Sequence, residues 1–285
     1  MEASSSQQQN PSPGQIAALI SILQLDLAEL HRPARVLLTS FGDHSVPSLL
    51  KTAQSEHMAT RTRSRAVLRD IQLGKLLQSF QRLDLGRVGR DSVRALFEGQ
   101  MLSTQMVRTF VPSPDRLIGH LRSHANALRD ECIGKGTPEC VKLLAKCIHQ
   151  KMGLQVVVRE PLVSDHYMIH KVVGAGVGAQ ITLSLIYVMV ARWAGLQAAV
   201  IKLPDQFLLR IGGARSILMN PMLDGQVITR GDCARASDVG SLRELSDREI
   251  LVEHLRCLWD RVPPGAATMI QGVTEVLDDG PASTA

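Results

Sequence analysis

Aromatic residues and long hydrophobic runs are scarce in this chain of 285 residues. Only nine residues (3%) are Phe, Trp or Tyr, whereas 45% of the residues are hydrophobic and 21% are charged. The apolar run over 181–191 has 11 residues, well below the roughly 20 that a membrane-spanning helix needs. We therefore expect no membrane span, and a soluble globular protein of one large or two ordinary domains.

Cysteine is also scarce, with five residues and no CxxC spacing. An odd number in a chain of this length disfavours a disulfide framework and indicates a reducing compartment. We expect a cytoplasmic protein, with the nucleus as the alternative. Residues 1–13 are polar and lack the features of a signal peptide, so we predict a disordered tail there.

The first half of the chain has the spacing of amphipathic helices. Apolar residues recur at i, i+3, i+4 and i+7 between residues 16 and 30, after a Pro-Gly step, which predicts one helix. The same spacing predicts helices over 45–57, 64–83 and 90–110. We therefore predict a helical, basic N-terminal region over residues 14–110.

The second half mixes helical and extended patterns. Helical patterns cover 115–133, 138–152, 180–194 and 247–262. The third of these is apolar on every side, which is typical of a buried central helix. Two extended runs flank a Gly-Gly-Ala turn at 212–214 and predict an antiparallel hairpin. Residues 263–285 are predicted to be a C-terminal helix and tail.

Three motifs in this half resemble the transglutaminase-like SirB-type family. The segment 168–196 is similar to the buried helix of that family, and Leu203-Pro-Asp-Gln-Phe-Leu-Leu-Arg210 is similar to its Pro-Gly-His-Phe-Leu-Val-Arg strand. Leu218-Met-Asn-Pro-Met-Leu-Asp-Gly225, followed by Arg230-Gly-Asp-Cys233, resembles its Ile-Asp-Pro-Phe-x-x-Gly hairpin and the acidic-Cys step after it. The resemblance covers residues 112–262.

The resemblance implies an α+β, mostly α, architecture. A helical N-terminal region would precede a transglutaminase-like (papain-like) core with a buried helix and a small antiparallel sheet. Active relatives use a Cys at the helix start, a His on the following strand and an acidic residue that orients the His. The matching positions here are Gln180, Gln206 and Asn220. The resemblance therefore implies a transglutaminase-like domain without its catalytic triad.

Amide side chains cannot replace that triad chemically. Gln and Asn have no titratable proton near neutral pH, so they hold hydrogen bonds but cannot act as a general base. The three amides are expected to keep the geometry of the old site, with Gln206 and Asn220 bonded across the hairpin. The alternative is an enzyme of another kind, a cysteine-independent hydrolase or acyltransferase that uses the same cleft. Its candidates are the hydroxyls of Thr182 and Ser184 and the imidazoles of His166 and His170.

Two further patterns are interpreted as structural. The glycines of 174–178 precede a helix, but their GxGxG spacing differs from the GxGxxG of dinucleotide-binding loops. Cys132, Cys140, Cys147 and His149 suggest a metal site, but two of these cysteines lie on an apolar helical face, where buried Cys acts as a small hydrophobe. Cys233 and Cys257 are interpreted in the same way. We predict no metal and no cofactor.

Positive charge is concentrated in one segment. From Met58 to Arg94 the chain has eight arginines and one lysine against three aspartates, a local net charge of +6 in a chain whose total is +5. The planar guanidinium suits carboxylate or phosphate recognition. The candidate binding residues are Arg61, Arg63, Arg65, Arg69, Arg87 and Arg90. Either this is a solvated helix surface, or it binds an anionic partner.

We therefore predict a catalytically inactive transglutaminase-like protein that acts as a protein-binding or scaffold module. The favoured partner is a protein with an acidic segment. Nucleic acid is disfavoured, since only Phe80 is available for base stacking in the basic segment. A eukaryotic F-box protein has the same module between an F-box and a C-terminal domain. This chain has no F-box-like Leu-Pro-x-Glu start, so adaptor work in protein turnover is an analogy with that protein.

Overall fold

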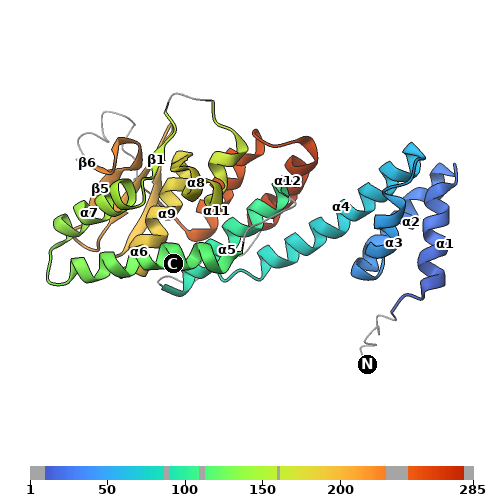
Figure 1. Cartoon of the computed structure of the whole chain (residues 1–285), viewed down its shortest axis with the longest axis horizontal. Coiled ribbons are helices and arrows are strands. Elements are labelled where there is room, and N and C mark those ends of the chain that lie inside the picture. The colour runs from blue at the N-terminus through green and yellow to red at the C-terminus, as the bar shows by residue number, and fades with distance from the viewer. Residues whose placement is uncertain (1–9, 87–89, 109–112, 159–160, 229–242, 279–285) are drawn as a thin grey trace. The chain divides into compact units, whose positions relative to one another are not determined.

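The computed structural model describes residues 10–86, 90–108, 113–158, 161–228 and 243–278. The chain divides into two compact units, Met1–Gln78 and Ser79–Ala285. Figure 1 labels their helices and strands. The limits of 14–110 and 112–262, which we derived from the sequence, stay predictions of where the basic region ends and the family module begins.

The first unit is built from helices. They are α1 (Pro13–Gln24), α2 (Ala28–Ser40), the short 3-10 turn η1 (Gly42–His44), α3 (Val46–Thr52) and α4 (Met58–Gln81), of which α4 extends beyond the unit. A capping box begins α1, because the Ser12 hydroxyl accepts from the Gln15 N–H while the Gln15 side chain accepts from the Ser12 N–H.

The prediction of one helix over residues 16–30 is wrong. The helix α1 ends at Gln24, and the extended backbone of Leu25 leads into α2. The cause lies elsewhere in the chain: Arg63 on α4 donates to the carbonyls of Leu23 and Leu25, each at 3.0 Å. Carbonyls at a helix end need such partners, so the arginine supplies what continued helix would have supplied and lets α2 fold back on α1.

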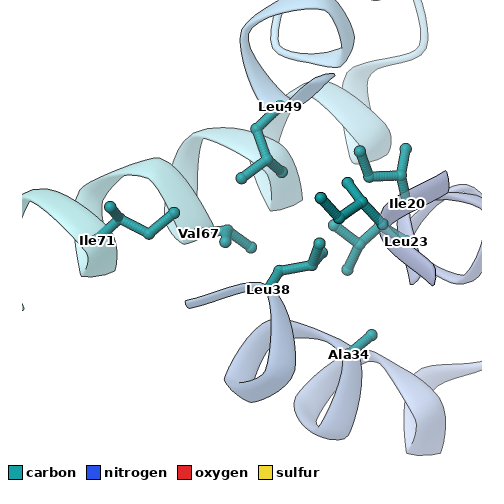
Figure 2. Packing of buried hydrophobic residues seen from close by; sticks show 8 residues of the cluster. Ile20, Leu23, Ala34, Leu38, Leu49, Val67 and Ile71 are labelled. Atoms are coloured by element: carbon teal, nitrogen blue, oxygen red, sulfur yellow. The ribbon is translucent and has the colours of Figure 1, made fainter. Parts of the chain in front are cut away.

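A single apolar cluster holds the first unit together. Figure 2 shows Leu38 of α2, Leu49 of α3 and Val67 of α4 pointing toward one another, with Ile20 of α1 beside them. The side chains of Leu38, Leu49 and Val67 are fully buried. Burying each such side chain stabilises the fold by about 1.5–3 kcal/mol, so the helical pattern of the sequence becomes a core only where the helices meet.

The second unit combines helices with a small sheet. Its larger helices are α5 (Arg90–Val107), α6 (Pro114–Cys132), α7 (Thr137–Lys146), α9 (Gln180–Trp193), α11 (Asp247–Trp259) and α12 (Pro264–Asp278). Shorter helical turns are the π-turn η2 (Cys147–Lys151), η3 (Ser164–Tyr167), α8 (Ile169–Ala175) and η4 (Pro221–Leu223). None of the helices in the described ranges has the length and apolar character needed to cross a bilayer.

The sheet has five strands in the order β6-β5-β4-β3-β7, and all neighbours are antiparallel. They are β3 (Ala198–Lys202), β4 (Phe207–Ile211), β5 (Ile217–Asn220), β6 (Gln226–Ile228) and β7 (Glu244–Leu245). The predicted hairpin is confirmed, because β4 pairs with β5. Two further short strands, β1 (Gln155–Val156) and β2 (Val177–Gly178), pair in parallel.

The helix α9 lies at the centre of this unit. It packs against β3 and β4 and also contacts α5, α6 and α11 (Figure 1). From Ile181 to Ala191 every residue of α9 is buried, which confirms the expected buried central helix. The predicted class is confirmed as well: the protein is mostly helical, with a small antiparallel sheet.

A buried ion pair ties the end of α9 to the start of α11. The Arg192 guanidinium donates to both carboxylate oxygens of Asp247, at 2.7 and 2.8 Å, and to the carbonyl of Ala198 at 3.0 Å. The side chains of Arg192 and Asp247 are 11% and 5% exposed. A paired and hydrogen-bonded charge is tolerated in the interior, so this contact orients the helices without leaving a bare charge.

Candidate functional site

The N-terminus of α9 places the first candidate residue, Gln180. The chain approaches it through β2, where a Cβ on Gly178 would lie 2.6 Å from Val172 and 2.9 Å from Leu183. Only glycine fits so close an approach, which explains one of the glycines that precede the helix. The close packing at Gly178 thus agrees with the structural interpretation of these glycines.

The structure brings the three amide positions together. The Gln180 amide donates to the main-chain carbonyl of Phe207 at 2.8 Å, and Phe207 directly follows Gln206. The Asn220 amide donates to the Gln206 side-chain oxygen at 3.1 Å, and its own oxygen accepts from the Met222 N–H at 2.9 Å. These hydrogen bonds join the start of α9, the start of β4 and the end of β5. We call the three residues Gln180, Gln206 and Asn220 the amide cluster.

The side chains of the amide cluster form hydrogen bonds but have no titratable proton to transfer near neutral pH. Gln180 and Gln206 are half-buried, and Asn220 is 6% exposed. Their amides donate and accept hydrogen bonds and remain uncharged near neutral pH. With neither a thiolate nor an imidazole in these three positions, the arrangement can orient a polar group but supplies neither nucleophile nor general base.

The alternative nucleophiles are enclosed by the core. The hydroxyls of Thr182 and Ser184 belong to side chains with 0% exposure and have no hydrogen-bond partner among the described residues. His166 accepts from the Val163 N–H through Nδ1 at 3.2 Å. Burial, with the nearby Lys171, lowers the pKa of His170. A substrate therefore has no open path to either hydroxyl.

The sequence reasoning missed a second polar pair, His149 and Tyr187. His149 Nδ1 lies 2.7 Å from the carbonyl of Leu154, so it carries the proton, and Nε2 accepts from the Tyr187 hydroxyl at 2.6 Å. Burial, with the charge of Asp224, raises the pKa of Tyr187. A cavity of about 490 Å³ adjoins His149 between α7 and the turn into β6. Nothing in the sequence pairs these residues, because 38 positions separate them.

The cysteines that suggested a metal site lie in the protein core or beside it. Cys140 and Cys147 are buried, and Cys132 is half-buried. Burial raises the pKa of Cys147, and burial together with the neighbouring Cys140 raises the pKa of Cys132 to about 12. Across the described ranges, no three His, Cys, Asp or Glu side chains are grouped as ligands of a metal ion. Cys233, with its Arg230–Cys233 motif, lies outside the described residues.

The candidate arginines of α4 separate into two kinds. Arg61 donates to the Ser55 carbonyl at 3.2 Å, and Arg63 bonds the carbonyls at the end of α1 and Asp26. Arg65 and Arg69 are exposed and make no hydrogen bond or ion pair with other described residues. Two of the four are thus structural and two face solvent. Arg87 lies outside the described residues, as does the side chain of Arg90.

The comparisons with known proteins agree with this geometry. No curated protein and no solved structure matches the chain. Residues 115–254 match the family model of the transglutaminase-like superfamily. The match runs from α6 to α11 and includes α9, the sheet and the whole amide cluster. The second unit of this chain therefore carries a transglutaminase-like domain over residues 115–254.

Proposed function

We propose that the transglutaminase-like domain is of the SirB type, is catalytically inactive, and works as a protein-binding or scaffold module. The observation that supports this is the amide cluster: Asn220 bonds to Gln206 and to the Met222 N–H, and Gln180 bonds to the main-chain carbonyl of Phe207. The resemblance assigns these three positions to nucleophile, base and orienting acid. Each position has kept hydrogen-bonding capacity and lost its reactive group. Adaptor work in protein turnover is the role that the resemblance to an F-box protein suggests.

Rate arithmetic supports inactivity. Loss of a single member of a triad lowers the rate by about 10⁴ to 10⁶, and further losses add little because the group acts as a unit. The buried hydroxyls of Thr182 and Ser184 do not offer a replacement. What remains is a folded domain with a polar cluster at the old cleft, which fits recognition better than turnover.

Restoring the triad tests this proposal directly. The variant Gln180→Cys/Gln206→His/Asn220→Asp is compared with wild type and with Gln197→Cys, which places a thiol at an exposed position away from the cluster. We expect wild type to hydrolyse neither thioester nor amide substrates above buffer. The cysteine at position 180 should react with iodoacetamide at lower pH than the one at position 197, because a helix N-terminus and an imidazole lower a thiol pKa.

Two results would count against the proposal. Wild-type turnover that disappears in Ser184→Ala would make the protein a cysteine-independent hydrolase or acyltransferase. Equal thiol reactivity at positions 180 and 197 in the variants would show that the amide cluster has not kept the geometry of a catalytic site. Mass spectrometry of the alkylated peptides separates both thiols from the five native cysteines.

We further propose that the partner is a protein with an acidic segment, bound through the solvent-facing arginines of α4. Arg65 and Arg69 are one helical turn apart and both exposed. Poly-glutamate should bind the full chain at low salt and be released at high salt, and Arg65→Glu/Arg69→Glu should weaken binding about tenfold. Tighter binding of a single-stranded oligonucleotide than of poly-glutamate would contradict the choice of a protein partner.

A further inference from the structure

The first unit has an open groove that its own core does not fill. The groove has a volume of about 890 Å³ and runs between α2 and α4, with one end at the junction of α1 and α2. Leu23 and Val67 form its buried floor, and Val36, Ala66, Leu73 and Leu77 line its walls. All the lining residues belong to the first unit.

The α2 wall of the groove exposes an apolar side chain to solvent. Val36 is 60% exposed although it lines the groove. Gly74, on the α4 wall, would place an added Cβ in open space, with no atom within 4 Å. Arg35 of α2 and Asp70 of α4 form an ion pair across the groove. Its second hydrogen bond joins Arg35 Nη2 to Asp70 Oδ1 at 2.7 Å. Helices of a bundle bury their apolar stripes against a neighbour, and among the first unit's described residues only Leu23 of α1 lines the groove besides residues of α2 and α4.

The rim of the groove is positively charged. Arg32, Arg35 and Arg63 line it, against Asp70 alone among the acidic residues. Asp70 is already bonded to Arg35, and Arg63 is held by the carbonyls of α1 and by Asp26. Arg32 is exposed and makes no bond with other described residues. An occupant that carries carboxylates beside its apolar face would therefore meet a complementary charge.

We propose that this groove binds an amphipathic α-helix of a partner protein, with its apolar stripe on the floor and acidic side chains toward Arg32. A helix suits the site because the first unit has helices and no strand among its described residues, so it offers no strand edge for an extended peptide. The α4 wall runs from Arg63 to Leu77, about 21 Å at 1.5 Å per residue, so an occupant of about 14 residues matches its length. The floor takes anchors at i, i+4, i+7 and i+11.

This inference goes beyond the proposed function, since it concerns the first unit and holds whether or not the transglutaminase-like domain is an enzyme. It also differs from the poly-glutamate surface, because Arg65 and Arg69 are not among the lining residues of the groove. Failure of one proposal therefore leaves the other standing.

The test measures fluorescence anisotropy of labelled peptides with the full chain. One peptide of about 14 residues has Leu at the anchor positions and Glu elsewhere, the second has Lys in place of Glu, and the third has the Glu composition with its Leu residues scrambled. The full chain carries Arg65→Glu/Arg69→Glu throughout, so that the poly-glutamate surface does not bind the acidic peptides. We expect saturable binding of the Leu/Glu peptide, roughly tenfold weaker binding of the Leu/Lys peptide, and at least tenfold weaker binding of the scrambled one.

Gly74→Phe is the decisive variant because it fills the groove without meeting a neighbour. Glycine in the interior of a helix destabilises that helix, so replacing Gly74 should keep the fold. Circular dichroism then verifies that the variant has the helix content of wild type. Gly119→Phe is the matched control: it too lies in a helix, α6, with no atom within 4 Å of an added Cβ. Gly74→Phe should abolish binding of the Leu/Glu peptide, Gly119→Phe should leave it unchanged, and Arg32→Glu should weaken it about fivefold.

Three results would overturn the proposal. Absence of saturable binding of the Leu/Glu peptide would do so, as would equal affinity of folded Gly74→Phe and the parent Arg65→Glu/Arg69→Glu chain. Equal affinity of the Leu/Glu and Leu/Lys peptides would show that the rim does not select acidic partners. Arg116→Glu, at an exposed position on α6 outside the groove, should leave the affinity for the Leu/Glu peptide unchanged; a loss there equal to that of Arg32→Glu would show that the peptide binds by non-specific charge attraction.

Discussion

His254, a fully buried titratable group of the second unit, makes the stability of that unit depend on pH. The side chain has 0% exposure, its two ring nitrogens have no hydrogen-bond partner among the described residues, and its ring lies edge-on to Tyr167 with centroids 6.0 Å apart. Burial lowers the pKa of His254 from 6.5 to about 3. The imidazole is therefore neutral in the folded protein over the whole range in which it becomes charged when unfolded.

The sign follows from counting protons. Between pH 6.5 and about 3 the unfolded chain carries a proton on His254 that the folded chain does not. Where the unfolded state binds more protons, the free energy of unfolding rises with pH. Stability is thus complete above pH 6.5 and falls as the pH falls. Each pH unit contributes about 1.4 kcal/mol, so lowering the pH from 7.5 to 4.5 should remove about 3 kcal/mol through this residue.

His254→Phe isolates this contribution. Urea unfolding followed by tryptophan fluorescence reports on the second unit, because Trp193 and Trp259 both lie there. The free energy lost between pH 7.5 and 4.5 should be about 3 kcal/mol smaller in the variant than in wild type. His120→Phe, at an exposed position on α6, should change that loss by less than about 0.5 kcal/mol. An equal loss in wild type and His254→Phe would refute the reasoning, since it would mean that the folded protein protonates this ring.

Three further changes probe the contacts that hold the second unit. Asp247→Ala should lower the free energy of unfolding by about 3–5 kcal/mol in urea titrations, because it leaves Arg192 buried without its carboxylate. Gly225→Ala should destabilise by more than about 2 kcal/mol, since Gly225 has a φ of +74° and an added Cβ would lie 2.6 Å from the Tyr187 hydroxyl. Tyr187→Phe should destabilise by about 1–2 kcal/mol in thermal unfolding, because it removes the donor to His149.

Matched substitutions separate these causes from general effects. Glu98→Ala removes the partner of Arg94 in an exposed pair and should leave the free energy of unfolding nearly unchanged. An equally small loss for Asp247→Ala would contradict the role of burial. Gly134 has a φ of +75° with no atom within 4 Å of an added Cβ. Gly134→Ala should therefore lower the free energy of unfolding by about 1 kcal/mol, the cost of a left-handed backbone at a non-glycine residue. If Gly225→Ala cost no more than this, the contact with Tyr187 would not contribute to its effect.

Local pattern was enough for most helices and for the hairpin. The apolar residues of α9 surround the helix on every side. A helix of this kind is stable in a soluble protein only when it is buried on all sides, so its sequence predicts a central position. The β4–β5 pair follows from two extended runs around glycines. The same local pattern failed at residues 16–30, because the partner that ends α1 is Arg63, some forty residues away.

The candidate site, too, was predicted only in part from the sequence. Motif order, taken with the family resemblance, located Gln180, Gln206 and Asn220, and residue chemistry alone states that amides transfer no proton. Only the folded chain shows which atoms of these amides bond. The pair of His149 and Tyr187 could not be predicted, because a tyrosine on an apolar helix carries no sign of its partner.

The sequence by itself therefore determined the kinds of helix and strand, the transglutaminase-like motifs, the amide side chains at three motif positions and the basic stretch around α4. Tertiary structure alone decided which arginines are structural, which hydroxyls are enclosed, and that a groove with a positive rim separates α2 from α4. The physical reason is range: helical and strand periodicity is set by neighbours within about four residues, whereas burial and ion pairing depend on side chains that meet only after the chain has folded.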